Sequence, residues 1–310
     1  MPIPLAVIGA PSSAGAYAPG QEKAPHALRA AGLIEKLRSH ALVVEDRGDV
    51  PGFRWRVDRA RPRAMNVDAA VRVARATAVH VAAAMARGSK ALVLGGDCSI
   101  EIGTVAGARA GTQSVGLVYI DLDTDLHTPD STTDGALDWM GVAHMLGLPG
   151  AAPELVNLGQ NAPLLTPDQV LFFAAGNVKA PERAIIEQHG MAEIPLAEVA
   201  ADPVAAARKA ESWARKFERL LIHLDVDVLD YLALPLAENT RRNIGLNLDQ
   251  LMTALTTLLA APNFAALTIC EINPDHGEAD GATLRIFAEA LAESFAASRR
   301  VKLASRIAEG

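Results

Sequence analysis

The chain has 310 residues, of which 50% are hydrophobic and 21% are charged, and its net charge is -7 at pH 7. Such a length can bury a large core, as one α/β domain or two smaller ones, and the acidic balance disfavours nucleic acid or an anionic membrane as the main partner. The sequence has no basic leader with an apolar core and no apolar run long enough to cross a bilayer, and two cysteines are too few for a disulfide framework, so we expect a cytoplasmic protein.

Strand-like and helix-like segments alternate along the chain. Short runs rich in Val, Ile and Leu predict strands at 5–8, 41–45, 91–94, 115–120, 155–158, 169–174, 220–227 and 266–270. Apolar residues at helical spacing predict helices at 25–40, 66–86, 100–110, 181–188, 204–216, 248–259 and 281–297. This alternation is typical of a mostly parallel sheet covered by helices on both faces, a three-layer α/β/α fold. Because no linker-like segment interrupts it, we predict a single domain over residues 1–310.

Carboxylates and a thiol follow several of these strands at the point where each strand ends. In open parallel sheets, ligands bind at the carboxyl ends of the strands. Carboxylates this close in sequence repel one another unless a cation lies among them. The sequence therefore predicts a divalent-metal site at that edge of the sheet. The residues concerned are Cys98, Asp121, Asp123, Asp125, Asp225, Asp227 and Glu271.

Each of these motifs has a simpler interpretation when it is taken alone. The segment Asp121–Asp125 could be a solvated loop, but it is not an EF-hand, because Leu126 stands where that loop needs Gly and Thr132 where it needs Glu. Cys98 could be a buried small hydrophobe, although its place after Gly-Gly-Asp favours a ligand. Cys270 lies inside an apolar run and is predicted to pack in the core.

The order of these motifs resembles that of the arginase/agmatinase superfamily, the ureohydrolases. The family's three metal motifs read roughly G-G-D-H, D-A-H-x-D and D-x-D-x-x-D-P, and they are matched here by Gly95–Cys98, Asp121–Asp125 and Asp225–Asp230. The late E-x-N-P motif is matched by Glu271–Pro274, and Gly20–Arg29 resembles the start of arginases. The resemblance extends over nearly the whole chain and implies an arginase-like fold.

The resemblance also implies a site and a chemistry. In that family two Mn²⁺ ions per subunit share a bridging hydroxide, which attacks the guanidinium carbon of the substrate. Glu271 would grip the guanidinium through a charge-assisted pair, and Asp125 would relay a proton to the leaving amine. The partner would be a small cationic guanidino compound. Because relatives in this family are commonly trimers or hexamers, the resemblance also implies a homo-oligomer, a trimer or a hexamer. Carried over by position, one ion would be held by Cys98, Asp121, Asp125 and Asp225, and the other by Asp121, Asp123, Asp225 and Asp227.

The sequence departs from the family pattern at two ligands and in the substrate loop. Cys98 and Asp123 stand where the family has histidines, so the metal shell becomes more anionic, which should make the cluster a weaker Lewis acid. A thiolate also suits zinc or iron, so another divalent metal would fit. Asp138 replaces the family's proton-transferring histidine, with His127 and His144 nearby as substitutes; for each histidine the alternative is a packed or surface residue.

Cysteine and aspartate at these two positions resemble a small branch of the superfamily, the Nω-hydroxy-arginine amidinohydrolases, which release hydroxyurea and ornithine. An N-hydroxyguanidine is less basic than a guanidine and suits a less acidic metal site, so we expect this substrate ahead of arginine. Asp134 and Asn177 are expected to contact it. The alternatives are an agmatinase or guanidino-acid hydrolase, a non-catalytic homologue that acts as a binding protein, and an enzyme with Cys98 as its nucleophile.

Overall fold

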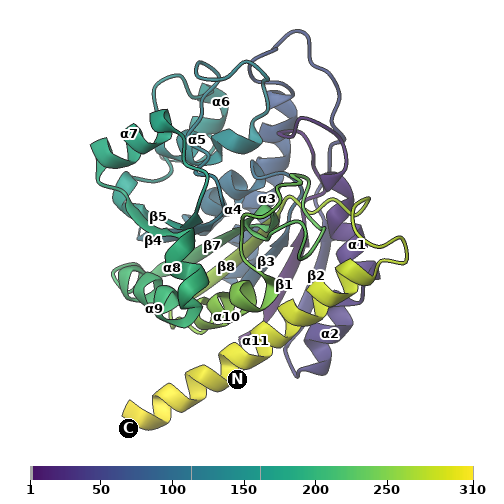
Figure 1. Ribbon diagram of the computed structural model, residues 1–310, viewed down its shortest axis with the longest axis vertical. Helices are drawn as coiled ribbons and strands as arrows, with labels where there is room; N and C mark the ends of the chain where they lie inside the picture. Colours follow the sequence, from purple (N-terminus) through teal and green to yellow (C-terminus); the bar gives the residue numbers. More distant parts are fainter. Residues whose placement is uncertain (1–2, 113, 161, 310) are drawn as a thin grey trace.

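The computed structural model describes residues 3–112, 114–160 and 162–309, and it is built around one eight-stranded β-sheet (Figure 1). The strands lie in the order β2-β1-β3-β8-β7-β4-β5-β6, and every neighbouring pair is parallel. The predicted α/β fold with a parallel central sheet is confirmed. The strands are β1 (Leu5–Gly9), β2 (Val44–Asp49), β3 (Lys90–Leu94), β4 (Val115–Ile120), β5 (Val170–Ala175), β6 (Ala192–Pro195), β7 (Arg219–Asp225) and β8 (Phe264–Cys270).

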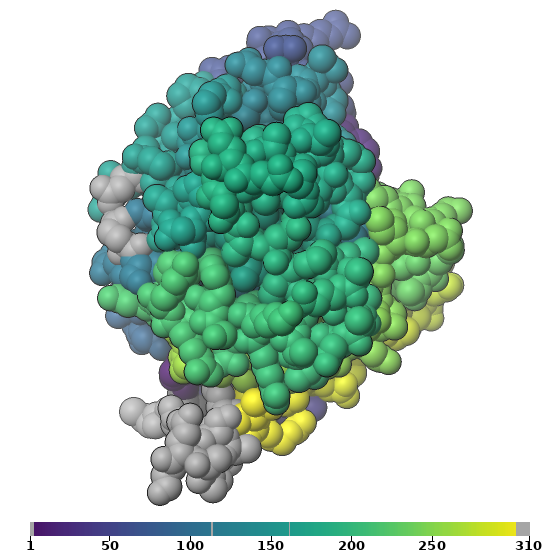
Figure 2. All heavy atoms as spheres, turned by 60° about the vertical axis from the view of Figure 1, so that its left-hand side comes forward, coloured from purple at the N-terminus to yellow at the C-terminus, as the bar shows by residue number. Residues whose placement is uncertain are grey.

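Helices cover both faces of this sheet. They are α1 (Ala24–Ala30), α2 (Leu33–Ser39), α3 (Val67–Ala86), α4 (Ile100–Ala108), α5 (Gly141–Leu146), α6 (Pro153–Val156), α7 (Ala180–His189), α8 (Leu196–Ala201), α9 (Pro203–Ala214), α10 (Leu248–Leu259) and α11 (Ala282–Glu309). Successive residues of a strand point to opposite faces. Leu92 and Leu94 of β3 therefore share a core with α1, α2 and α8–α11, whereas Ala91 and Val93 share one with α3–α7. In Figure 2 the face turned forward is formed largely by the teal and green segments that include α7, α8 and α9.

Some local predictions were wrong, each for a physical reason. Residues 155–158, predicted as a strand, lie partly in the short helix α6, where Pro153 takes a first-turn position that needs no backbone donor. The predicted helix 25–40 is divided at Gly32, whose φ of 83° separates α1 from α2. The predicted strand 41–45 begins later, as β2. The short elements β6, α5 and α8 were not predicted, because they are too brief to show a period.

Helix α3 is, within the described residues, the one helix long and apolar enough to cross a membrane by length and composition. It is a helix of this α/β core, because its buried residues share the apolar cluster of α4 and the sheet. The same composition is found in core helices of such folds, so it is weak support for a membrane span.

Helices α3 and α4 pack closely because two residues of α4 lack side chains. A Cβ atom on Gly103 would lie 2.4 Å from the carbonyl oxygen of Ala74, and one on Gly107 would lie 2.5 Å from that of Ala78. Neither backbone can yield without moving one helix away from the other.

We expect Gly103→Ala to lower the free energy of unfolding by about 1–3 kcal/mol, although alanine is the better helix former. Urea denaturation of the purified variant measures this change. Gly141→Ala in α5 is the matched control, because a Cβ atom there meets nothing closer than 3.6 Å. Equal stability of the two variants would contradict the close α3–α4 contact.

Candidate metal centre

The residues that follow four adjacent strands come together at one edge of the sheet. Strands β3, β8, β7 and β4 are consecutive neighbours in space, although they are far apart in sequence. Because they are parallel, their carboxyl ends meet at the same edge. A small buried pocket of about 10 Å³, called the inner pocket here, lies there and has room for about one water molecule. It is lined by Tyr17, Cys98, Asp123, Asp125, Asp138, Trp139, Asp225, Asn239 and Glu271.

Three aspartates form the centre of this arrangement. One carboxylate oxygen from each of Asp121, Asp225 and Asp227 lies within 4.8 Å of the others, and all three residues are buried. Oδ1 of Asp121 and Oδ1 of Asp225 each accept a hydrogen bond of 2.7 Å from the backbone N–H two residues later, which fixes the turn after each strand. Oδ2 of Asp121 and Oδ1 of Asp227 are buried without a hydrogen-bond partner in the described part of the chain. Unpartnered buried oxygens are costly unless a cation meets them.

The electrostatics of the three aspartates also call for a cation. Burial raises the pKa of Asp121 and of Asp225 well above the ordinary value, and the neighbouring carboxylates raise both further. Burial raises the pKa of Asp227 as well, while the guanidinium of Arg241 lowers it. The cluster is therefore best satisfied at neutral pH by positive charge from outside these three residues.

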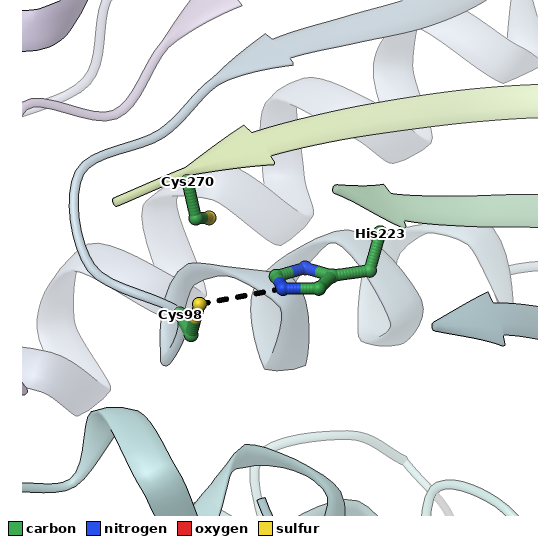
Figure 3. Close-up of side chains that lie close together, drawn as sticks. All are labelled: Cys98, His223 and Cys270. Carbon is green, nitrogen blue, oxygen red and sulfur yellow. Dashed lines mark hydrogen bonds between the residues drawn. The ribbon is translucent and has the colours of Figure 1, made fainter. Parts of the chain in front are cut away.

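Cys98 lies opposite His223 and Cys270 (Figure 3). Its Sγ atom is 3.3 Å from Nε2 of His223 and 3.3 Å from Oδ2 of Asp225. Nδ1 of His223 faces Oε2 of Glu101 at 3.5 Å, and both side chains are fully buried. The contact with Glu101 and the Tyr119 ring, which stacks on His223, hold the imidazole beside the Cys98 thiol.

The two cysteines are free thiols, and both are buried. Cys270 packs in the core, as predicted, but it also faces Cys98 across the cluster. Burial raises the pKa of the Cys98 thiol well above its ordinary value, and Cys270 and Asp225 add to this. A buried, protonated thiol is a poor nucleophile, whereas a bound cation would stabilise the thiolate as a ligand. The geometry thus favours a ligand over a nucleophile at this position.

Glu271 closes the other side of the inner pocket. Its Oε1 accepts a hydrogen bond of 3.1 Å from the backbone N–H of Cys98, and its Oε2 accepts one of 3.0 Å from the Gln21 amide. Burial raises its pKa to about 8. The backbone of Glu271 has a φ of 66°, and that of Asp125 has a φ of 50°. Non-glycine residues in this region are strained, and the surrounding structure has to hold them there.

Asp125 and Asp138 face the same pocket from different segments. Oδ2 of Asp125 accepts a hydrogen bond from the Tyr119 hydroxyl, and the Tyr119 ring stacks on His223 with 4.1 Å between the ring centres. The backbone N–H of Asp138 donates to the carbonyl of Gly15 at 3.1 Å. Burial raises the pKa of both carboxyls well above the ordinary value. The small-residue loop after β1 therefore positions Asp138.

Arg241, in the loop before α10, forms ion pairs with two of the predicted metal ligands. Its Nη2 lies 2.5 Å from Oδ2 of Asp123, and its Nη1 lies 3.2 Å from Oδ2 of Asp227. Asn177 donates to Oδ1 of Asp123 at 2.5 Å, and Asn239 donates to Oδ2 of Asp227 at 2.8 Å. Both oxygens of Asp123 and one oxygen of Asp227 are therefore already paired.

A second space, called the outer pocket here, adjoins the inner one. It has a volume of about 320 Å³ and shares Asp123 and Trp139 with the inner pocket. Its walls carry both carboxylates and cationic groups, which suits a ligand with charges of both signs. Its other lining residues are His127, Asn177, Lys179, Glu182 and Arg241.

Apart from Asp121, Asp227 and Cys270, which belong to the clusters described above, three residues singled out from the sequence lie outside the lining of both pockets. Asp134 is exposed, and its Oδ1 accepts from the backbone N–H of Ala136 at 3.1 Å, so its contact with a substrate stays a prediction. His144 is buried, with Nδ1 against a backbone carbonyl of its own helical segment, and burial lowers its pKa to about 4. Asp230 accepts from backbone groups of its own turn, a local structural role.

Several contributors were missed by the sequence analysis, namely Tyr17, Gln21, Glu101, His223, Asn239 and Arg241. His223 had a usable signal, because it lies two residues before Asp225 on one strand and so points to the same face. Asn239 and Arg241 had none, since the loop that carries them has no period from which a direction can be read.

The residues present fit a divalent cation at one position. The unpartnered oxygens of Asp121 and Asp227, with Asp225 and the adjacent Cys98 thiol, are donors that divalent cations take in proteins. The second position expected from the sequence, between Asp123 and Asp227, does not fit in the same way, because the guanidinium of Arg241 lies there.

Comparison with known proteins gives a consistent answer. A family model described as the arginase family matches residues 3–296. Arginase-1 of Rattus norvegicus is 29% identical over 283 residues, which are 89% of this chain and 87% of that protein. The arginase of Bacillus subtilis (strain 168) is 29% identical over 292 residues, 93% of this chain and 97% of that one. The solved arginase of Bacillus caldovelox superposes with a TM-score of 0.84 and 26% identity, covering 94% of this chain and 98% of that chain.

The buried carboxyls predict how stability depends on pH. Asp121, Asp125, Asp138 and Asp225 have raised pKa values, and that of Glu271 is about 8. A carboxyl whose pKa is higher in the folded than in the unfolded protein contributes stability below its ordinary pKa, and this is lost as pH rises through the folded value. We expect metal-free protein to melt at a higher temperature at pH 5 than at pH 8.

A divalent cation binds the ionised carboxylates, so Mn²⁺ should raise the melting temperature more at pH 8 than at pH 5. At a concentration a hundred times Kd the gain is about 2.7 kcal/mol. Differential scanning calorimetry of chelator-treated protein, with and without Mn²⁺, measures both effects. A metal-free protein whose melting temperature rises from pH 5 to pH 8 would contradict the expected protonation of this cluster.

Proposed function

Because the chain belongs to the arginase family, whose members are amidinohydrolases that act on C–N bonds, we propose that its substrate is a guanidino amino acid. The first choice is Nω-hydroxy-L-arginine, hydrolysed to hydroxyurea and ornithine, and the second is arginine, hydrolysed to urea and ornithine. A non-catalytic homologue is not favoured, because metal-binding groups are retained at all six ligand positions.

The single observation that carries this choice is the thiol of Cys98 at 3.3 Å from Asp225 inside the inner pocket. A thiolate among carboxylates places more negative charge around a cation than an imidazole would, which weakens the cation as a Lewis acid. A weak Lewis acid is best matched with a substrate that is easily presented neutral. An N-hydroxyguanidine, being less basic than a guanidine, meets that requirement.

The lining of the outer pocket favours an amino-acid substrate over an amine that has no carboxylate. Lys179 provides an exposed ammonium group on its wall, and Glu182 provides a carboxylate. The Lys179 ammonium can pair with the α-carboxylate of an amino acid. Glu182 is buried, and its two oxygens already accept from the Thr124 hydroxyl and the Lys179 backbone N–H. Agmatine has no carboxylate for Lys179 to bind, so an agmatinase is the less favoured alternative.

We propose Mn²⁺ as the resident cation at the position that fits, held by Asp121, Asp225 and Asp227 with the adjacent Cys98 thiol. When bound, such a cation lowers the pKa of water and stabilises developing negative charge. Glu101 and His223 would orient the thiol towards it, and the N–H groups after Asp121 and Asp225 would hold the carboxylates in place.

The remaining side chains would bind the substrate and move protons. Glu271 presents a buried carboxylate to the guanidino group. Asp125 and Asp138 line the same pocket and can give a proton to the leaving amine, which is the role of a general acid. His127, on the wall of the outer pocket, is proposed to carry protons to solvent. The Tyr17 and Trp139 rings stack beside the inner pocket, with 6.4 Å between the ring centres.

We also propose that the protein works in the cytoplasm as a homo-oligomer, a trimer or a hexamer. The support is the resemblance to the arginase family, whose members are commonly oligomeric. Analytical ultracentrifugation of the purified protein would measure the oligomeric state.

A panel of guanidino compounds tests the proposed function. Manganese-loaded protein should convert Nω-hydroxy-L-arginine with a higher kcat/KM than arginine, and agmatine should be the poorest of the three. Ornithine is measured by chromatography, and urea and hydroxyurea are measured by colour reactions. Absence of product from every compound would overturn the function, and faster turnover of agmatine would overturn the substrate class.

Glu271→Gln should lower kcat/KM roughly 10- to 100-fold, because a neutral amide cannot form a charge-assisted pair with the guanidino group. Metal content should stay unchanged, since Glu271 is not among the proposed ligands. Glu278→Gln, a few residues further on and exposed, is the control. Unchanged kcat/KM in the Glu271 variant would remove this residue from substrate binding.

A further inference from the structure

The side chain of Arg241 lies deep enough in the carboxylate cluster to act as one of its cations. Its ion-pair partners are well buried, with side-chain exposures of 15% for Asp123 and 1% for Asp227. The guanidinium uses two different nitrogens for two different carboxylates, a bridging geometry that a planar fork of donors makes well. These ion pairs therefore differ from solvent-exposed salt bridges on a protein surface, which contribute little to stability.

Arg241 pairs with some carboxylate oxygens of the cluster and leaves others free to bind a metal ion. Asp123 has both oxygens paired, by Arg241 and Asn177, and Oδ2 of Asp227 is paired by Arg241 and Asn239. Among the aspartates of the described residues, the buried oxygens without a hydrogen-bond partner are Oδ2 of Asp121 and Oδ1 of Asp227. These are on two of the three aspartates whose oxygens gather within 4.8 Å. The free donors therefore gather around one point, and the carboxylates on the other side are engaged by Arg241.

We infer that Arg241 takes the place of a second metal ion, so that this chain binds a single divalent cation in its carboxylate cluster. The inference rests on the proposed function, because it takes these carboxylates as the metal centre of that enzyme. It departs from the two ions expected from the sequence. A tethered guanidinium is present at high effective concentration, and a second divalent ion would have to displace it and then lie beside its positive charge.

Asp123 and Arg241 balance each other's charge in the cluster. A carboxylate in place of a neutral imidazole adds one negative charge to the cluster. The guanidinium returns one positive charge at the same spot, 2.5 Å from that carboxylate. Arg241 also lines the outer pocket, whereas Glu271 and Cys98 line the inner one. The Arg241 side chain thus lies between the outer pocket and the carboxylate cluster. It does not line the inner pocket, where the guanidino group of the substrate is proposed to bind.

Metal counting on the whole protein tests this inference. Chelator-treated wild-type protein is equilibrated with Mn²⁺, and the ions per subunit are counted by mass spectrometry after dialysis. We expect one ion in the wild type. Arg241→Met keeps the unbranched apolar stem of the side chain but removes the guanidinium. It should bind a second ion roughly 10- to 100-fold more tightly than the wild type does, because a neighbouring positive charge no longer repels that ion.

Arg242→Met is the matched control, because the adjacent Arg242 is exposed and receives the same change. It should still bind one ion. Electron paramagnetic resonance on the wild type gives a reading that needs no variant, since an isolated Mn²⁺ ion and an exchange-coupled pair have different hyperfine patterns. The isolated pattern is expected.

Two results would overturn the inference: two tightly bound, coupled ions in the wild type, or a single ion in Arg241→Met. Its failure is separable from that of the proposed function. Two ions together with hydrolysis of a guanidino compound would overturn the inference alone. One ion without any hydrolysis would overturn the function and leave the count of ions standing.

Discussion

The structure depends on how a concentration of buried negative charge is neutralised. Six aspartates and Glu271 come within one small region at the edge of the sheet, and most of them are buried. Two unit charges 4 Å apart repel by about 4 kcal/mol at an effective dielectric constant of 20, so several such pairs would outweigh the stability of an ordinary domain. Protons, a bound cation and the guanidinium of Arg241 are the ways in which the described residues can meet this cost.

The fold can tolerate this electrostatic repulsion because the segments that hold the carboxylates are rigid. The carboxylates follow β4 and β7, adjacent strands with an apolar core on each face of the sheet. Their first oxygens are fixed by backbone N–H groups two residues later. Of the second oxygens, that of Asp225 lies 3.3 Å from Cys98 Sγ, and that of Asp121 has no hydrogen-bond partner among the described residues. Close backbone approach at Gly96, where a Cβ atom would lie 1.8 Å from the Ser12 carbonyl oxygen, brings the loop of Cys98 against the loop after β1. The repulsion is thus held by packing and by backbone hydrogen bonds.

Membership of the arginase family gives this arrangement its chemistry, and the departures from the family pattern fall on the groups that set its charge. Cys98 and Asp123 each exchange a neutral imidazole for a group that can become an anion. At Asp123 the added charge is matched by Arg241, while at Cys98 the thiol is surrounded by His223 and Asp225. In the proposed metal centre, the first exchange changes how many metal ions are needed, and the second changes how strongly a bound cation polarises its ligands.

The sequence by itself determined the fold class and the identity of most of the charged residues. Alternating strands and helices require a parallel sheet, and a parallel sheet brings strand ends such as Asp121 and Asp225 to one edge. Both conclusions follow from short-range periodicity and from topology, which a single sequence contains. It could also have indicated His223, which shares the face of Asp225 on β7.

Only the tertiary structure decided which side chains from outside those strands contact the carboxylates. Arg241 and Asn239 belong to an irregular loop, and Gln21 and Tyr17 come from the other end of the chain, so their directions depend on long-range packing and on no local pattern. For the same reason Asp134 and His144, close to the site in sequence, lie outside both pockets. A sequence lists the charges of a site, but their pairing depends on distances that folding alone sets.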